Sequence, residues 1–426
     1  FCMDGLVYPD RTPHTGLKEL KNVQRPVRVK DFDGEKKQVT IQNKLDFTNL
    51  KDFLTIRYTL ENDGETVYTG EISCEDCLDL PPHELKTLTL DYPDLEAGKA
   101  YLKLDYIQKA DRPFTPKGFL LGFDQVEVPT KDNANQMVAK LLAEKTEGTI
   151  EVKEEERSIT LSGSSFCYVY NKLKGLFSEL VADNRTLLTR PMEYNIWRAP
   201  TDNDRNIREE WEKWGYHHLS TRAYDTHWER LTNGSVALRT KVALTSVYLP
   251  TIVTVTACWT VRPDGEIRTE LHGEKKALQA FLPRFGLRLF LPKNCNQVEY
   301  LGYGPYESYI DKRRASYIGK FASPVSAMHE DYIKPQENGS HYHCDYVTVT
   351  GEHGGLMAYS QVPFSFNASQ YTQEELTQKK HNYELTPCGE TVLCLDYRQS
   401  GIGSASCGPK LAEKYQLNEL SFDFSI

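Results

Sequence analysis

Short segments in which apolar and polar residues alternate run along most of this 426-residue chain. In LTIRYTL (54–60) the even-numbered positions are apolar and the odd-numbered positions are polar. This period of two is typical of a β-strand with one buried face and one face toward solvent. The pattern returns in several places, among them TLTLDY (87–92), SITLSG (158–163), VTVTACWTV (253–261) and DYVTVTG (345–351). The chain is therefore predicted to be all-β.

The alternating segments form two groups. About seven of them fall between residues 27 and 128 at intervals of roughly 8–12 residues, the spacing of an immunoglobulin-like β-sandwich. The tripeptide Asn62-Asp63-Gly64 separates two of these segments and is a hairpin-turn signal. Residues 129–147 are more polar and are predicted to form a linker. From residue 148 to 426 the strand patterns follow one another without a repeat period, which predicts one large antiparallel sandwich.

Only two stretches show helical periodicity, DRNIREEWEKWG (204–215) and TQEELTQKKH (372–381). In the first, Ile207, Trp211 and Trp214 recur at i, i+4 and i+7, so they share one face of the expected helix. The five tryptophans of the chain are predicted to be mostly core residues, since tryptophan at helix or strand spacing usually packs inside.

The composition excludes several functional classes. The net charge is −9 and no block of Lys and Arg occurs, so a nucleic-acid partner is not expected. The longest apolar run, residues 249–261, is too short and too rich in Thr to cross a membrane. The sequence also has no Gly-rich phosphate loop, HExxH motif or GxSxG motif.

The ten cysteines follow no repeated spacing, which predicts mostly reduced thiols and not a disulfide framework. Cys74 and Cys77 have CxxC spacing, but no second pair of zinc ligands follows at the required distance. This pair is therefore predicted to lie in a plain loop.

Six unusual strings occur in order along the chain. They are FCMDGLVYPDRTPH (1–14), RAPTDND (198–204), YLGYGPYESYIDKRRAS (300–316), KPQENGSH (334–341), FSFNASQYT (364–372) and SGIGSASCGP (400–409). Together they resemble the C-terminal half of the large bacterial β-galactosidases of glycoside hydrolase family 2. The likeness extends over essentially the whole chain.

The resemblance implies a five-domain parent whose third domain is a (β/α)₈ barrel with two catalytic glutamates upstream of Phe1. Residues 1–26 would be the remnant of the last barrel loop and helix, and 27–128 the immunoglobulin-like fourth domain. After the linker at 129–147, residues 148–426 would form the fifth domain, a large sandwich related in fold to galactose mutarotases. The compartment, cytoplasm or periplasm, is left open.

The parent implied by the resemblance hydrolyses terminal β-D-galactosides such as lactose with retention, and it is expected to be a homo-oligomer. A retaining glycosidase needs two carboxyl groups about 5 Å apart on a rigid scaffold. This chain shows no alternation of strands and helices that could build a barrel to hold them. It is therefore expected to be inactive by itself, to act as a scaffold and to close one wall of the active site.

The resemblance also assigns site residues in the complete enzyme. The carbonyl of Phe1 and the side chain of Asp4 correspond to sodium ligands beside the galactose, and oxygen donors suit this hard cation. Magnesium is expected in the complete enzyme as well. Asn206 belongs to a segment, 205–216, that corresponds to a loop over the active site. Val392 stands where the resemblance places a tryptophan of the aglycone side, which puts that contact in doubt.

Two motifs look like metal sites but are predicted to be structural. Asp202 and Asp204 lack the further ligands of a calcium loop and are expected to cap the following helix. In His341-Tyr-His343-Cys344, an extended backbone would place the two histidines on one face and Cys344 on the other. A structural strand is the preferred interpretation of this run.

A group of charged residues is predicted to form buried ion pairs that order long loops. Its members are Glu307, Arg313, Arg314 and Glu337.

Two other functions are left open at this stage. A self-sufficient mutarotase-like enzyme would need a paired His and carboxylate in the large sandwich, where Glu337, His341 and Asn367 are a possible sugar groove. A carbohydrate-binding module would instead hold sugar on exposed aromatic side chains.

Overall fold

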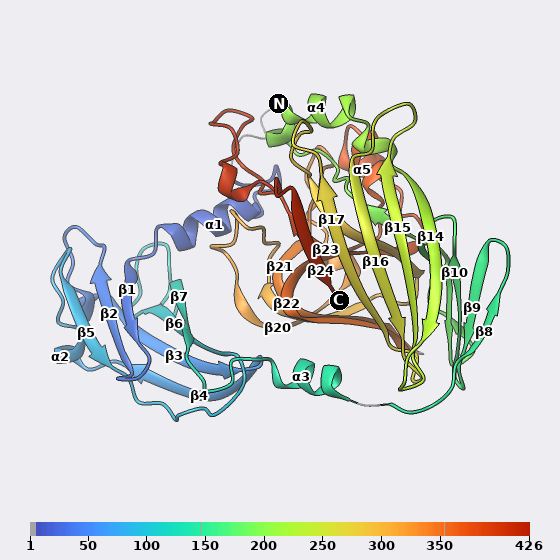
Figure 1. The fold of residues 1–426 in the computed structure, drawn as a ribbon. Coiled ribbons are helices and arrows are strands. Elements are labelled where there is room, and N and C mark those ends of the chain that lie inside the picture. The colour runs from blue at the N-terminus through green and yellow to red at the C-terminus, as the bar shows by residue number, and fades with distance from the viewer. Residues whose placement is uncertain (1–5, 145, 353) are drawn as a thin grey trace. The chain divides into compact units, whose positions relative to one another are not determined.

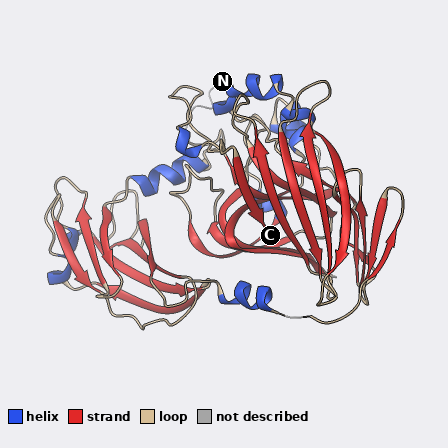
Figure 2. Cartoon of the chain, viewed as in Figure 1, coloured by secondary structure: helices blue, strands red, loops and turns tan. Residues whose placement is uncertain are grey.

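The computed structural model describes residues 6–144, 146–352 and 354–426. Strands make up most of the secondary structure, as Figure 2 shows, and this confirms the predicted all-β class. The chain forms two compact units, which we describe separately. The first unit contains the chain up to Leu142 together with residues 301–306 and 313–321, and the second unit contains the rest.

The first unit is built on two antiparallel sheets (Figure 1). One sheet has the strand order β1-β2-β5 and the other has the order β4-β3-β6-β7. Seven antiparallel strands divided three and four make an immunoglobulin-like sandwich. The elements are α1 (Thr15–Val23), β1 (Val27–Asp33), β2 (Gln38–Asn43), β3 (Leu54–Asn62), β4 (Glu65–Ile72), α2 (Glu75–Leu78), β5 (Leu85–Thr89), β6 (Ala100–Gln108) and β7 (Leu120–Val128), followed by α3 (Gln136–Ala143).

The alternating segment LTIRYTL forms β3, as predicted. Its residues Leu54, Ile56 and Leu60 are fully buried and belong to the same core cluster as Leu102 and Leu104 of β6. The strand therefore turns one face into the sandwich and the other toward solvent.

The turn signal after β3 is also confirmed. Asn62 pairs with Glu65 across the β3–β4 hairpin, so Asp63 and Gly64 form a two-residue loop. Both have positive φ, 49° and 83°, as a type I′ turn requires.

Asp124 on β7 is the polar centre of the first unit. Its carboxylate accepts hydrogen bonds from Nε of Arg25 at 2.9 Å, the backbone N–H of Val29 at 3.1 Å and the hydroxyl of Tyr106 at 2.7 Å. Both members of the Arg25–Asp124 ion pair are largely shielded from water. Burial, reinforced by the charge of Asp124, raises the pKa of Tyr106, so the phenol stays protonated and donates its proton to the carboxylate.

We expect Asp124→Ala to destabilise the first unit by about 3–5 kcal/mol, because it leaves the guanidinium of Arg25 buried without its partner. All five tryptophans lie in the second unit. Hydrogen exchange of first-unit amides therefore reports the loss, while the tryptophan fluorescence transition should keep its midpoint.

The matched control is Asp33→Ala, which removes the exposed partner of Lys36. It should leave exchange rates unchanged, because exposed ion pairs contribute little. Equal effects of the two substitutions would contradict the structural role of Asp124.

The second unit contains most of the larger sheets of the chain, although residues 301–304 and 317–321 of the seven-stranded sheet belong to the first unit. A seven-stranded sheet has the order β13-β18-β23-β22-β21-β19-β20, and two five-stranded sheets have the orders β14-β15-β16-β17-β24 and β12-β11-β10-β9-β8. From β8 onward the strands and helices are β8 (Glu151–Glu154), β9 (Ser158–Ser162), β10 (Phe166–Asn171), β11 (Leu176–Ala182), β12 (Arg185–Thr186), β13 (Arg190–Asn195), α4 (Ile207–Lys213), β14 (Ser220–Arg230), β15 (Val236–Thr245), β16 (Val253–Val261), β17 (Ile267–Lys275), β18 (Arg284–Pro292), β19 (Gln297–Gly304), β20 (Tyr317–Pro324), β21 (Ser340–Gly351), β22 (Gly354–Ser369), α5 (Gln373–Gln378), β23 (Glu390–Gln399) and β24 (Ser421–Ser425).

The strand β16 shows how this unit is held together. Val253, Val255, Trp259 and Val261 alternate along it and are buried. The indole of Trp259 packs edge-on against Phe177 of β11, with ring centroids 5.5 Å apart. Trp259 thus confirms the prediction that tryptophans at strand spacing belong to the core.

Both predicted helices are present but shorter than their sequence patterns. After α4 the backbone enters the left-handed region at Gly215, which ends the helix. The helix α5 begins after Thr372, whose side chain accepts a hydrogen bond from the backbone N–H of Glu375 at 3.1 Å.

The prediction of a plain loop with free thiols at the CxxC pair is wrong. Cys74 and Cys77 form a disulfide, because the single-turn helix α2 brings their Cα atoms to 5.3 Å, within reach of an S–S bond. Cysteines elsewhere in the described chain are free. Across the same described residues, no helix has the length and apolar character needed to cross a membrane.

Candidate functional site

The guanidinium of Arg284, at the start of β18, is fully buried in the second unit. It donates hydrogen bonds to both carboxylate oxygens of Asp396, at 3.0 and 2.5 Å, and to Oε1 of Glu337 at 2.6 Å. It also donates to the amide oxygen of Asn367 at 3.2 Å. Arg284, Glu337 and Asp396 are all removed from solvent, so these contacts replace water completely.

Neighbouring strands bring these partners together. In the antiparallel register, Gly286 of β18 lies opposite Asp396 of β23, and Asp396 lies opposite Ser365 of β22. A Cβ atom on Gly286 would lie 2.1 Å from the carbonyl oxygen of Leu395 and 2.6 Å from the Asp396 carboxylate. The missing side chain of Gly286 therefore permits the close approach of β23 that seats Asp396 beside Arg284.

Arg198 forms a second buried cluster beside the first. It donates to both carboxylate oxygens of Asp204, at 3.0 and 2.8 Å, and to the backbone carbonyls of Ser400 and Gly401, at 2.6 and 3.0 Å. These contacts tie the loop after β13 to the loop after β23.

Glu337 joins the two clusters. One of its oxygens bonds Arg284, and the other accepts the backbone N–H of Ala199 at 3.1 Å. Burial raises the pKa of Glu337 and of Asp396, against the opposing pull of the Arg284 charge. The network is closed, because its carboxylates are committed to guanidinium or backbone donors.

Sequence analysis did not single out Arg198, Arg284 or Asp396. A signal for Arg284 was present, because it interrupts the apolar run FLPRFGLRLFLP (281–292). A charged residue in such a run is buried only when it has a partner.

The motif that was predicted to cap a helix does something different. Thr201 and Asp204 form a capping box on a 3-10 turn at Asp202–Asp204, and Asp204 also pairs with Arg198. Asp202 accepts instead from Lys334 at 3.1 Å. The prediction that both aspartates cap the helix α4 is therefore wrong, because that helix begins only after Asn206, whose side chain makes no cap bond.

Buried ion pairs were predicted for a charged group that included Glu307 and Glu337. Both carboxylates are buried and paired, Glu307 with Lys312 and Glu337 with Arg284. Arg313 and Arg314 belong to the first unit, where their backbone N–H groups donate to the carboxylate of Glu19 at 3.1 and 2.7 Å.

Glu307 has a set of donors of its own. Its carboxylate accepts from Nζ of Lys312 at 2.7 Å, the hydroxyl of Tyr332 at 2.5 Å and the backbone N–H of Gly339 at 2.9 Å. Burial acts to raise the pKa of Glu307, but Lys312 and these hydrogen bonds outweigh it and lower the pKa to about 2.

Three of the predicted substrate-side or ion-side residues are Phe1, Asp4 and Val392. Phe1 and Asp4 lie outside the described residues, so the sodium site stays a prediction. Val392 lies in β23 and is buried beside Phe290 and Cys394. Val392 is 1% exposed in this chain, and its place on the substrate side of the complete enzyme stays a prediction.

Asn206 lies at the surface directly before α4. It lines a cavity of about 200 Å³, which is formed by the loop before α4 and the loop after β23. Its lining includes Asp204 and Ile207 from the segment around the start of α4, and Gly403 and Lys410 from the loop after β23. The contact of Asn206 with substrate in the complete enzyme stays a prediction.

The possible sugar groove consists of Glu337 in the loop before β21, His341 on β21 and Asn367 on β22. Arg284 joins Glu337 and Asn367, whereas His341 packs between the rings of Tyr300 and Phe366, at centroid distances of 4.4 and 5.3 Å. The three predicted groove residues are at most 6% exposed. A sugar would reach them only if these side chains moved apart, and the groove stays a prediction.

The run His341-Tyr-His343-Cys344 lies in β21, as the strand interpretation predicted. The strand carries a bulge between His341 and Cys344, and His343 has a positive φ of 58°. In the chain as described, no three His, Cys, Asp or Glu side chains are arranged to hold a metal ion.

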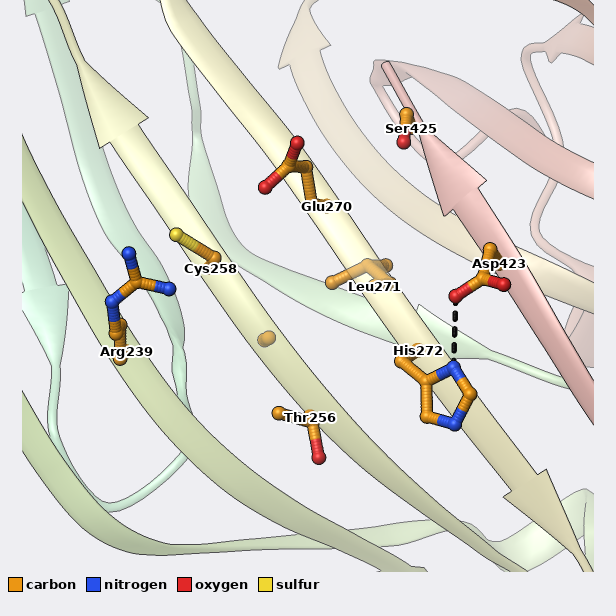
Figure 3. Close-up of a pocket in the computed structure, with 9 residues that line it drawn as sticks. Arg239, Thr256, Cys258, Glu270, Leu271, His272, Asp423 and Ser425 are labelled. Carbon is orange, nitrogen blue, oxygen red and sulfur yellow. Dashed lines mark hydrogen bonds and ion pairs between the residues drawn. The ribbon is translucent and has the colours of Figure 1, made fainter.

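Two larger cavities were not predicted. One, of about 390 Å³, lies on the face of β15, β16, β17 and β24 (Figure 3). There, Arg239, Cys258 and Glu270 stand side by side on neighbouring strands, and Nδ1 of His272 lies 2.8 Å from the carboxylate of Asp423. The other cavity has a volume of about 490 Å³. Its lining residues come from several segments between β10 and α5, and His217 is one of them.

Two family models match this chain. Residues 162–426 match the model described as beta galactosidase small chain, and residues 39–129 match the model described as beta-galactosidase, domain 4. The chain belongs to the β-galactosidase small-chain family.

Curated relatives agree with this β-galactosidase assignment. A protein of Actinobacillus pleuropneumoniae named beta-galactosidase is 41% identical over 422 residues, which is 99% of this chain and 40% of the relative. A beta-galactosidase of Staphylococcus xylosus is 34% identical over 431 residues, which is 100% of this chain and 42% of the relative. The chain thus spans about two fifths of the length of these relatives.

Among solved structures, a galactose 1-epimerase from Lactobacillus acidophilus aligns with 65% of this β-galactosidase-family chain and with 97% of its own chain. The TM-score is 0.30 and the sequence identity is 7%. We draw no conclusion from this alignment.

The pKa of Glu307 predicts how acid destabilises the second unit. Its pKa falls from 4.5 to about 2 on folding, so the stabilisation is present above pH 4.5 and is lost as the pH falls toward 2. The contribution at neutral pH is about 3 kcal/mol. Urea unfolding followed by tryptophan fluorescence should show this loss in the natural chain, and Glu307→Gln should flatten it.

The exposed Glu413 provides the control for this experiment. Glu413→Gln removes one carboxylate from the surface and should keep the natural dependence on pH. A Glu307→Gln variant with the same slope as the natural chain between pH 4.5 and 2 would contradict the assignment.

Proposed function

We propose that this chain is the C-terminal part of a retaining β-galactosidase that hydrolyses terminal β-D-galactosides such as lactose. The observation that carries the proposal is the 41% identity to a relative named beta-galactosidase across 99% of this chain. Two matches to β-galactosidase family models, one over residues 39–129 and the other over residues 162–426, support it.

We further propose that the chain has a supporting role and does not carry out the bond cleavage. A retaining glycosidase needs one carboxylate free to attack the sugar and one carboxyl group able to donate its proton to the leaving oxygen. Four of the buried carboxylates of the second unit, those of Asp204, Glu307, Glu337 and Asp396, are engaged by arginine, lysine or backbone donors. Their engagement favours a structural role over nucleophilic or acid–base chemistry.

The cavity beside Asn206 is the part of the chain that we propose as a wall of the active site in the complete enzyme. Residues from both loops line this cavity. Arg198 holds the first loop through its ion pair with Asp204 and the second loop through its hydrogen bond to the carbonyl of Gly401. Such bracing matters because a site wall that shifts by about 1 Å costs catalytic efficiency.

Ions and partner subunits are also part of the proposal for the complete enzyme. Sodium would be held by Phe1 and Asp4, whose oxygen donors suit a hard cation. No residue of this chain is proposed for magnesium. The complete enzyme is proposed to be a homo-oligomer that binds galactosides.

The test compares this chain with the product of the complete gene. The purified chain should release no galactose from lactose above the rate of a blank. The complete enzyme should release it, and proton NMR during the first turnovers should show the β-anomer before it equilibrates. Galactose release by the chain alone would overturn its supporting role, and an initial α-anomer would overturn retention.

A further inference from the structure

The cavity of about 490 Å³ in the second unit, which we call the His217 cavity, has the size of a small-molecule site, a range of about 300–1,000 Å³. The 3-10 turn at Tyr216–His218 forms one side, and β13 forms another. Arg288 of β18 and Glu374 of α5 complete the polar part of the lining. Four separate parts of the chain therefore line one cavity that is partly open to solvent.

The imidazole of His217 is the feature of this cavity that the fold leaves unexplained. Its Nδ1 atom is buried and has no hydrogen-bond partner among the described residues. A buried polar atom without a partner costs about 1–3 kcal/mol, so such atoms in folded proteins usually have a ligand or water. A hydroxyl group can satisfy Nδ1 in either tautomer, because a hydroxyl both donates and accepts.

The surroundings of His217 favour the neutral form of its ring. Burial lowers the pKa of His217, and the neighbouring His218, whose ring centroid is 3.9 Å away, lowers it further. A neutral imidazole has no net charge to attract an anion, and either of its nitrogens can hydrogen-bond a hydroxyl.

The charged residues of the lining cancel one another. Nε of Arg288 donates to Glu193 at 2.8 Å, and Nη1 donates to both carboxylate oxygens of Glu374 at 2.9 Å. With Lys174 the lining has two positive and two negative side chains, so its sum is zero. An ionic ligand would gain no net attraction, whereas the outer faces of both carboxylates can accept hydrogen bonds from hydroxyl groups.

The same cavity has an apolar wall. Trp197 lines it and packs against His217 with ring centroids 5.6 Å apart, and Met192 and Tyr194 of β13 lie beside it. Aromatic and apolar surface next to hydroxyl acceptors matches the two faces of a pyranose ring, one with C–H groups and the other with hydroxyls.

We propose that the His217 cavity binds a neutral saccharide of one or two rings, with a sugar hydroxyl hydrogen-bonded to Nδ1 of His217. Glu193 and Glu374 accept further hydroxyls, and the side chains of Trp197 and Met192 contact the apolar face of the sugar. The site belongs to this chain alone, so it goes beyond the proposed hydrolysis and does not depend on it.

The test is calorimetric titration of the full chain with lactose and, separately, with galactose. We expect saturable binding below about 50 mM for at least one of the two sugars. His217→Phe keeps a ring beside Trp197 but removes Nδ1, and it should weaken the binding at least fivefold. The matched control is His272→Phe on β17, which lies outside this cavity and should bind as the natural chain does.

A second variant keeps the proposal testable if His217→Phe does not fold. Thr221→Trp on β14 fills the cavity from its edge and should abolish binding, while circular dichroism shows that the sheets remain. Absence of binding by both sugars, or unchanged affinity in both cavity variants, would overturn the proposal.

Charged sugars test the chemical class. Galactosamine and galacturonate should bind more weakly than galactose, because the lining has no net charge. Tighter binding of either ion that depends on His217 would overturn the neutral class. All of these measurements use this chain without hydrolysis, so their failure is distinct from a failure of the proposed galactosidase function.

Discussion

The ion pairs of Arg198 and Arg284 are the constraint on which the second unit depends. A guanidinium that is fully removed from water is tolerated only when its donors meet acceptors in good geometry. Here the acceptors come from β22, β23 and the loops on either side, and Glu337 serves both clusters. If the loop that carries Glu337 moved, Arg284 would lose one of its acceptors and the backbone of Ala199 would lose its partner. The loops around the two clusters are therefore held in place together.

The first unit uses the same device on a smaller scale. Asp124 collects donors from Arg25, Val29 and Tyr106, so one carboxylate joins the end of α1 to two strands. In both units the apolar faces of the strands supply most of the burial, and the buried charges determine which loops lie over them.

Strand positions could be predicted from the sequence because their signal is local. The alternation in LTIRYTL or VTVTACWTV depends on neighbours two residues apart, and the buried faces of β3 and β16 follow it. The partners of charged side chains could not be predicted in this way. Glu337 lies 53 residues from Arg284, and Arg198 lies 202 residues from Ser400, so no short window contains both members.

For the candidate sites, too, the sequence predicted some features and not others. The resemblance of six motifs predicted the β-galactosidase family, and the family models confirm it. Individual site residues were harder, because a position such as Val392 is exposed or buried according to its sheet and not its neighbours in sequence. The His217 cavity had no sequence signal, since its lining comes from segments between Asn171 and Glu374 that only the fold assembles.

The long separation between Arg198 and its carbonyl partners also has a consequence for biosynthesis. A ribosome adds about 5–20 residues per second, so roughly 10–40 s pass between the emergence of Arg198 and that of Ser400. During that interval Arg284 likewise lacks Asp396. The nascent second unit therefore cannot close its interior while translation is under way, and it is in this window that it is most exposed to chaperones and to misassembly.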